Sequence, residues 1–164
     1  MTTPTSTRNL SGLIALSCLA GMLFAMYLQY YQHLQPCPLC ITQRLFITLT
    51  GITGFIAWIH NPLIIGQKIY ALAGVLFGVL GASFSGRQVW LQQLPPDQVP
   101  SCGPSFQYML ETFPLSETLE IMLTGDGNCA EVNWTLLGMS IPTWVLAMFT
   151  SLIIANLYIA LSRR

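Results

Sequence analysis

The sequence predicts an all-α membrane protein, a four-transmembrane-helix bundle with a long outer loop that carries a short amphipathic helix. Of the 164 residues, 53% are apolar and only 7% are charged, whereas a soluble globular domain has about 25% charged residues. Such a chain cannot cover a water-facing surface in the ordinary way. This argues against a cytosolic enzyme, a disordered chain and a nucleic-acid-binding protein, which needs a basic surplus. The length indicates one integral membrane domain, residues 1–164.

Long uncharged runs are the second observation. A helix that crosses the roughly 30 Å hydrocarbon core of a bilayer needs about 20 apolar residues. The helices of a soluble bundle would need polar faces, which these runs lack. The first run is not a signal peptide, because it is too long and no cleavage site follows it. The predicted spans are approximately residues 10–31, 40–60, 68–91 and 141–161, and the predicted outer loops are residues 32–39 and 92–140.

Basic residues orient these spans. With four spans, both termini and the 61–67 turn lie on one side, which carries Arg8, Lys68, Arg163 and Arg164. The two outer loops contain no Lys or Arg, and every acidic residue lies in the second of them. Because Lys and Arg concentrate in cytoplasmic loops, we expect both termini to be cytoplasmic and the acidic loop to lie outside.

Two further basic residues, Arg44 and Arg87, lie near the outer ends of the second and third spans, where orientation does not explain them. An ionisable residue at membrane depth is by default a functional-site hypothesis. The alternative is that both side chains extend to the outer headgroups. For Arg87, the sequence favours this alternative and a functional role equally.

Four of the five cysteines lie on the outer side of the predicted spans, and Cys18 is expected to pack inside the first span. An oxidising compartment lets cysteines persist as disulfides, so we expect two pairs, for which three connectivities are possible. Cys37 and Cys40 form a Cys-x-x-Cys motif that can close on itself, which leaves Cys102 and Cys129 as the second pair.

The Cys-x-x-Cys motif is more often redox-active or metal-binding than structural, because closing so short a loop constrains the unfolded chain little. A zinc site usually has two close pairs, and haem attachment needs a histidine where Ile41 stands, so we expect no metal. Pro38 suits the first helical position, which puts Cys40 near the positive end of the helix dipole. Arg44 lies four residues further on the same face. Both features favour the thiolate of Cys40, and the arginine can hold an anionic or oxygen-bearing ligand.

The second outer loop is rich in proline and glycine. Cys102 lies between Pro100 and Pro104, in a sequence that resists helix formation and favours an exposed, extended segment. Apolar residues at helical spacing follow, interrupted at Pro114, and predict a short amphipathic helix on the membrane surface. A disulfide in such a mobile loop is open to attack by the thiolate of a partner.

This pattern resembles the DsbB family of bacterial inner-membrane thiol:quinone oxidoreductases. The resemblance covers nearly the whole chain. It rests on Pro36-Cys37-Pro38-Leu39-Cys40 with Arg44, on Asp126-Gly127-Asn128-Cys129-Ala130-Glu131 and on Leu137-Gly138-Met139-Ser140-Ile141-Pro142-Thr143-Trp144.

The resemblance implies a relay in the inner membrane. A DsbA-like thioredoxin-fold periplasmic oxidase would attack Cys102 in a Cys102–Cys129 disulfide, and electrons would pass through Cys129 to the Cys37–Cys40 pair. Cys40 would then reduce a quinone, ubiquinone or menaquinone, held by Arg44, with Arg87 as a further quinone-binding candidate. Membrane lipid is the other expected partner, and no nucleic-acid partner is expected. The family often has a histidine after the third span, whereas here the stretch is Arg87-Gln88-Val89-Trp90-Leu91-Gln92-Gln93.

Two other functions remain open. The first is a vitamin K epoxide reductase-like quinone reductase, against which the motif on the second span argues, since that family has it on the last span. The second is a non-catalytic membrane subunit whose disulfides brace the outer loop, which would leave Arg44 unexplained.

Overall fold

Four long helices form the body of the protein, as the sequence predicts. The computed structural model describes residues 4–95, 97–103, 106–132 and 134–162, so Arg163 and Arg164 lie outside the described residues. All four helices are long and apolar enough to cross a membrane, and the protein is a multi-pass membrane protein. The helices are α1 (Pro4–Tyr31), α2 (Pro38–His60), α3 (Ile64–Leu91) and α6 (Ile141–Leu161).

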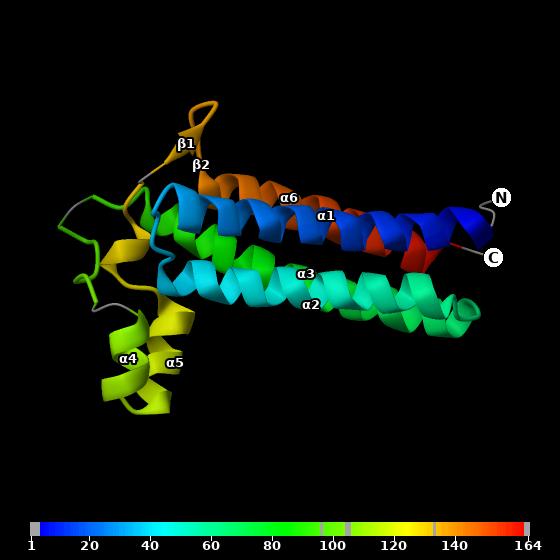
Figure 1. The fold of residues 1–164 in the computed structure, drawn as a ribbon, viewed down its shortest axis with the longest axis horizontal. Helices are drawn as coiled ribbons and strands as arrows, with labels where there is room; N and C mark the ends of the chain where they lie inside the picture. Colours follow the sequence, from blue (N-terminus) through cyan, green and yellow to red (C-terminus); the bar gives the residue numbers. More distant parts are fainter. Residues whose placement is uncertain (1–3, 96, 104–105, 133, 163–164) are drawn as a thin grey trace.

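The four helices lie side by side, and both termini emerge at the end of the bundle where α2 turns into α3 (Figure 1). Helix α3 begins at Ile64 rather than near residue 68, because the chain turns at Asn61, which adopts a left-handed conformation (φ 40°) as the cap of α2. At the same end, Arg8 Nε donates to the carbonyl oxygen of Trp58 at 3.3 Å, which joins α1 to α2.

Glycines allow α3 and α6 to pack closely. A Cβ at Gly81 would lie 2.2 Å from the ring of Phe149, which is fully buried, and one at Gly74 would lie 2.5 Å from Asn156. Small residues in membrane helices let two backbones approach in this way. The bundle therefore runs α1 against α2, α2 against α3, and α3 against α6.

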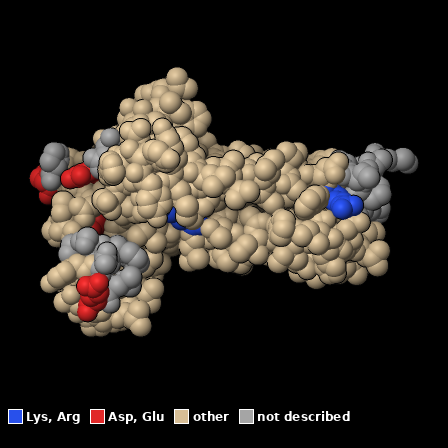
Figure 2. Space-filling view, in the orientation of Figure 1, with Lys and Arg blue, Asp and Glu red and all other residues tan. Residues whose placement is uncertain are grey.

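The opposite end of the bundle, called the outer end below, carries the smaller elements. These are α4 (Phe106–Thr112), α5 (Leu115–Thr124), the 3-10 turn η1 (Gly127–Cys129), β1 (Thr135–Leu136) and β2 (Met139–Ser140). The acidic side chains in view gather here, away from the ends of the chain (Figure 2). This matches the charge separation in the sequence.

The outer segment differs from the sequence prediction in two ways. It contains two short helices rather than one, because Pro114 caps α5 and starts a new helix after α4. The pair projects sideways from the bundle (Figure 1). The outer segment also contains a hairpin that was not predicted from the sequence, in which Leu137 (φ 54°) and Gly138 (φ 77°) form the turn between β1 and β2. Two residues with positive φ are the mark of a tight hairpin turn.

Candidate functional site

The start of α2 is built as the sequence predicts. Cys37 caps the helix, Pro38 occupies its first turn, and the Cys37 sulfur accepts a hydrogen bond from the Cys40 N–H at 3.3 Å. Cys40 thus lies in the first turn, where the positive end of the helix dipole favours a negatively charged sulfur. The two sulfurs are 2.7 Å apart, and the thiol of Cys37 donates to the sulfur of Cys40.

Cys37 is the centre of a buried sulfur cluster. It packs with Leu39, Leu91 and Cys129 in an apolar cluster at the outer end, and Cys129 is fully buried. Hydrogen bonds with Cys129 and then Cys40, together with burial, raise the pKa of Cys37 above its ordinary value. Cys37 therefore keeps its proton and contacts a sulfur on either side.

Cys102 lies at the protein surface, as the sequence predicts, in the stretch 101–103, which forms neither helix nor strand. This stretch runs along η1, where the Gly127 N–H donates to the carbonyl oxygen of Ser101 at 3.1 Å. A Cβ at Gly127 would lie 3.0 Å from the Cys102 sulfur and 2.5 Å from the carbonyl oxygen of Pro100. The close approach of the two segments therefore requires glycine at this position.

A buried carboxylate holds the two segments together. Asp126 Oδ2 accepts the Gly103 N–H at 3.2 Å and the Asn128 side-chain amide at 2.8 Å, and the same amide donates to the Gly103 carbonyl oxygen at 3.0 Å. Asp126 Oδ1 accepts from the Cys129 thiol at 3.5 Å. The Cys129 sulfur thus faces Asp126 and Cys37. The pairing of Cys102 with Cys129 stays a prediction, because no contact among the described residues tests it.

Two glutamines complete the site, and the sequence analysis assigned neither to it. Gln88 of α3 donates its side-chain amide to the sulfurs of Cys37 and Cys40 at 3.2 and 3.3 Å. Its carbonyl oxygen accepts from the amide of Gln43 of α2 at 2.7 Å, and both glutamines are buried. Gln92 belongs to the same stretch, where the DsbB family often has a histidine. Its side-chain oxygen accepts from the Ser140 hydroxyl at 2.7 Å and from no cysteine among the described residues. The amide nearest the sulfurs therefore belongs to Gln88.

Arg44 lies one helical turn beyond Cys40, inside a membrane-spanning helix. Its guanidinium donates to the side-chain oxygen of Gln29 and, at 3.2 Å, to the carbonyl oxygen of Ala25, both on α1. It is only partly buried, and within the described part of the chain these partners are neutral oxygens and no carboxylate pairs with it. A cation at membrane depth without an acidic partner is suited to bind an anionic or oxygen-rich ligand.

Arg87 has partners outside the sulfur cluster. Its Nε donates to the carbonyl oxygen of Thr124, the last residue of α5, at 2.7 Å, and its guanidinium lies over the ring of Trp90 at 5.6 Å. These contacts tie the end of α5 to α3. They give Arg87 a structural role next to the site, and its predicted role in quinone binding stays a prediction.

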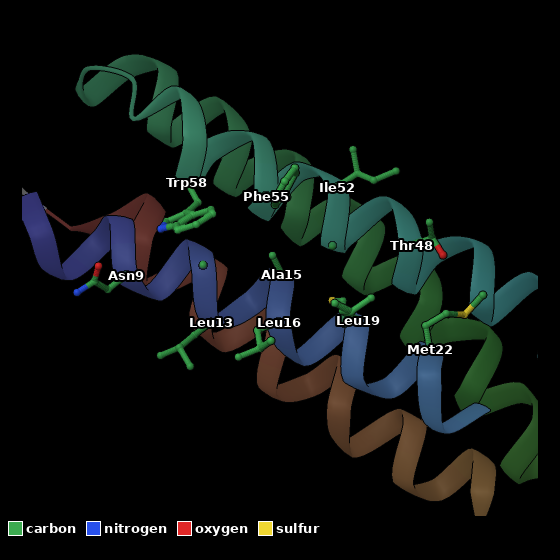
Figure 3. Close-up of a pocket in the computed structure, with 13 residues that line it drawn as sticks. Asn9, Leu13, Ala15, Leu16, Leu19, Met22, Thr48, Ile52, Phe55 and Trp58 are labelled. Carbon is green, nitrogen blue, oxygen red and sulfur yellow. The ribbon is translucent and has the colours of Figure 1, made fainter. Parts of the chain in front are cut away.

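A groove of about 700 Å³ runs between α1 and α2 (Figure 3). Apart from a few residues such as Asn9 and Thr48, its lining is apolar, and it starts at Thr48, one turn beyond Arg44, and extends to Trp58. Cys18 lines it and packs at 2.9 Å from where Gly51 would carry a Cβ, as expected for a packing residue. The four outer cysteines do not line this groove.

Comparison with known proteins identifies the family. The family model "Disulfide bond formation protein DsbB" matches residues 7–159. The chain is 47% identical over 153 residues to disulfide bond formation protein B of Saccharophagus degradans, covering 93% of this chain and 92% of the relative. It is 53% identical over 132 residues to the protein of that name from Hahella chejuensis, covering 80% of each. For the one from Acinetobacter baylyi the identity is 43% over 159 residues, covering 96% of this chain and 93% of the relative. Because the family model matches nearly all of its length and these relatives are 43–53% identical over most of it, the chain belongs to the DsbB family of disulfide bond formation proteins.

Proposed function

We propose that this protein is a thiol:quinone oxidoreductase, which reoxidises a periplasmic DsbA-like thiol oxidase and passes the electrons to a membrane quinone. The observation that supports this most strongly is the series of sulfurs at the outer end. Cys102 is exposed, Cys129 and Cys37 are buried in one cluster, and Cys40 lies beside Cys37 at the start of a membrane-spanning helix.

The first exchange takes place at the surface. A thiolate of the partner attacks the Cys102 sulfur, the Cys102–Cys129 bond breaks, and the electron pair leaves on Cys129. The partner's second thiolate then attacks the sulfur of the partner's first cysteine in the mixed disulfide and releases Cys102. The partner has lost two electrons and two protons and gained a disulfide. Cys102 and Cys129 have gained the electrons as two thiols.

The second exchange is internal. Cys129 attacks Cys37 in the Cys37–Cys40 disulfide, which forms a Cys129–Cys37 bond and leaves the electron pair on Cys40. Cys102 then attacks Cys129 and releases Cys37, which restores the outer disulfide and leaves the inner pair reduced. The packing of Cys37 and Cys129 in one buried cluster supports this step, because exchange needs the two sulfurs close together.

The residues around Cys40 fit a quinone. A bound quinone would accept two electrons and two protons and become a quinol, while the Cys37–Cys40 disulfide re-forms. Arg44 supplies N–H donors for a quinone oxygen one helical turn from the Cys40 sulfur, at membrane depth and without an acidic partner among the described residues. A lipid-soluble acceptor can reach this place from the bilayer.

The same proposal places the protein in the bacterial inner membrane with both termini in the cytoplasm. Arg8 lies near the start of α1 and Lys68 near the start of α3, at the end of the bundle that carries the termini. The acidic side chains in view lie at the outer end (Figure 2). This charge distribution agrees with the rule that basic residues stay on the cytoplasmic side. The cysteines of the outer end then face the oxidising periplasm.

One assay separates this function from that of a non-catalytic subunit. Purified protein is mixed with a reduced DsbA-type thiol oxidase and a water-soluble quinone, and quinone absorbance is followed over time. We expect reduction by the unmodified protein and by Cys18→Ser, the matched control in the α1–α2 packing, and none by Cys40→Ser. An unmodified protein without activity, or a Cys40→Ser variant with full activity, would exclude the proposed relay.

Two further variants test the order of the relay and the quinone site. Cys129→Ser should accumulate a mixed disulfide with the partner through Cys102, seen on a non-reducing gel and located by mass spectrometry. Trapping through Cys37 would reverse the proposed order. Arg44→Gln should weaken quinone binding at least tenfold while shifting the melting temperature little, and an unchanged quinone affinity would remove Arg44 from the site.

A further inference from the structure

We propose that Gln88 is a catalytic residue of the Cys37–Cys40 centre, whose side-chain amide stabilises the negative charge that develops on the Cys40 sulfur. Gln43 is then the positioning residue that fixes the direction of this amide. The inference rests on the proposed thiol chemistry and adds to it a group that contacts the reacting atoms.

The amide of Gln88 contacts both sulfurs of the motif. Its nitrogen lies 3.2 Å from the sulfur of Cys37 and 3.3 Å from that of Cys40. A glutamine amide carries two hydrogens, so one can be directed at each sulfur. Gln88 has only 3% of its surface exposed, and a hydrogen bond to a charged sulfur is stronger where water does not compete.

Gln43 sets the direction of the Gln88 amide. The Gln88 carbonyl oxygen accepts the side-chain N–H of Gln43 at 2.7 Å, and Gln43 is itself buried with 3% exposure. The same oxygen also accepts from the Cys40 thiol at 3.6 Å, which is longer than the contact of the amide nitrogen with that sulfur at 3.3 Å. If Gln88 alone were reversed, its NH₂ group would face that of Gln43, and its oxygen would take the closer positions beside the two sulfurs. Gln43 therefore holds Gln88 with its donors toward Cys37 and Cys40.

The Gln88 amide is in place at the step in which negative charge forms on the Cys40 sulfur. When the thiolate of Cys129 attacks Cys37, one S–S bond forms, the Cys37–Cys40 bond breaks, and the electron pair remains on Cys40. No proton has to move in this step. The Gln88 N–H is already within hydrogen-bond distance of Cys40, and donors placed in advance where charge develops lower the barrier. An amide also stays neutral at every working pH, so its support does not depend on titration.

The test uses the full-length chain with Cys18, Cys102 and Cys129 replaced by serine, so that only the Cys37–Cys40 pair reacts. Two quantities are measured without quinone or partner: the rate of iodoacetamide alkylation of reduced Cys40 at pH 7, and the reduction potential of the pair in glutathione buffers. Gln88→Leu should slow alkylation on the order of tenfold. Because the reduced form loses its stabilising donor, the potential should become more negative by about 30 mV, which corresponds to a tenfold change in the equilibrium constant.

Gln67→Leu is the matched control. Gln67 is a second buried glutamine of α3, toward the end that carries the termini, and among the described residues its two amide atoms have no hydrogen-bond partner. Its replacement should leave both quantities unchanged. Gln88→Leu behaving like Gln67→Leu, with parental alkylation rate and potential, overturns the proposal.

A second pair of variants covers the case in which Gln88→Leu does not fold. Gln88→Glu keeps the shape and the oxygen that accepts from Gln43 but has no N–H, so it should lower both quantities at least as much. Parental values in Gln88→Glu also overturn the proposal. Gln43→Met should lower both by a smaller factor, and no change there removes the positioning role. Since neither readout involves a quinone, failure of quinone reduction in the unmodified protein would reject the proposed function separately.

Discussion

Replacing Gly127 by alanine should detach the Cys102 segment from the buried cysteines. In the structure, a Cβ at this position would lie 2.5 Å from the Pro100 carbonyl oxygen and 3.0 Å from the Cys102 backbone nitrogen. Real Cβ contacts are essentially never shorter than 3.0 Å, so the segment must move outward by at least 0.5 Å, the difference between 3.0 and 2.5 Å. Both obstructing atoms belong to the backbone, and no side-chain rotation can relieve the clash.

The magnitude follows from the hydrogen bonds that join the two segments. These are the bond from the Gly127 N–H to Ser101, the bond from the Gly103 N–H to Asp126, and the bond from Asn128 to the Gly103 carbonyl. Each contributes about 0.5–1.5 kcal/mol net. Weakening all three should therefore cost about 2 kcal/mol, which corresponds to roughly thirtyfold more frequent opening of the segment.

Hydrogen–deuterium exchange with mass spectrometry measures this opening directly. In the reduced protein, peptides that contain residues 101–103 should exchange roughly thirtyfold faster in Gly127→Ala than in the unmodified chain. Gly86→Ala is the control, because outside its own helical backbone and chain neighbours no atom of the described residues lies within 4 Å of the Cβ that it adds, and a helix interior favours alanine over glycine. Equal protection of the segment in Gly127→Ala and Gly86→Ala would refute the argument that glycine is needed for the close approach.

Three further predictions concern stability. Arg87→Met removes the hydrogen bond to Thr124, so protection of α5 in hydrogen exchange should fall by about 1 kcal/mol while α6 is unaffected; equal protection in α5 would contradict the anchoring role. In the reduced protein, folding raises the pKa of Cys37 above its ordinary value of 9.0. Above pH 9 the folded protein therefore still holds this proton, whereas the unfolded chain has lost it. Stability from this source is present below pH 9 and is lost as the pH rises above it, so the melting temperature should fall between pH 8 and pH 10. This pH dependence should shrink in Cys37→Ser, and an equal fall there would assign it to other groups. Gly81→Ala places a methyl group 2.2 Å from the buried Phe149 ring, so the free energy of unfolding should fall by about 1–3 kcal/mol; an unchanged melting temperature would show that α3 and α6 can separate freely.

The membrane architecture could be predicted from the sequence because the bilayer imposes a local rule. A spanning segment must satisfy its own backbone hydrogen bonds, so apolar length alone identifies each helix. The four helices and the place of Pro38 in the first turn of α2 are confirmed. The same holds for the exposure of Cys102 and for the absence of helix at residues 101–103, which the flanking prolines predict. These features depend on neighbours within a few residues along the chain.

The outer segment was predicted less well. Apolar spacing indicated helix, and Pro114 indicated an interruption, but only the structure shows two separate helices. The hairpin of β1 and β2 is two residues long on each side. Such a short element carries too little alternation of polar and apolar residues to be recognised, and Leu137 is an unusual residue at a positive φ.

The sequence alone determined which residues can react: the Cys-x-x-Cys motif, the other two outer cysteines, and an arginine at membrane depth beside the motif. Tertiary structure decided which of them meet. Gln88 is 48 positions from Cys40 in the chain. The packing of η1 against α2 buries Cys129 beside Cys37, and the Cys129 thiol donates to Asp126. A buried glutamine has the same local sequence signal whether it faces a sulfur or only fills space. Its role depends on the packing of α3 against α2, which no local pattern encodes.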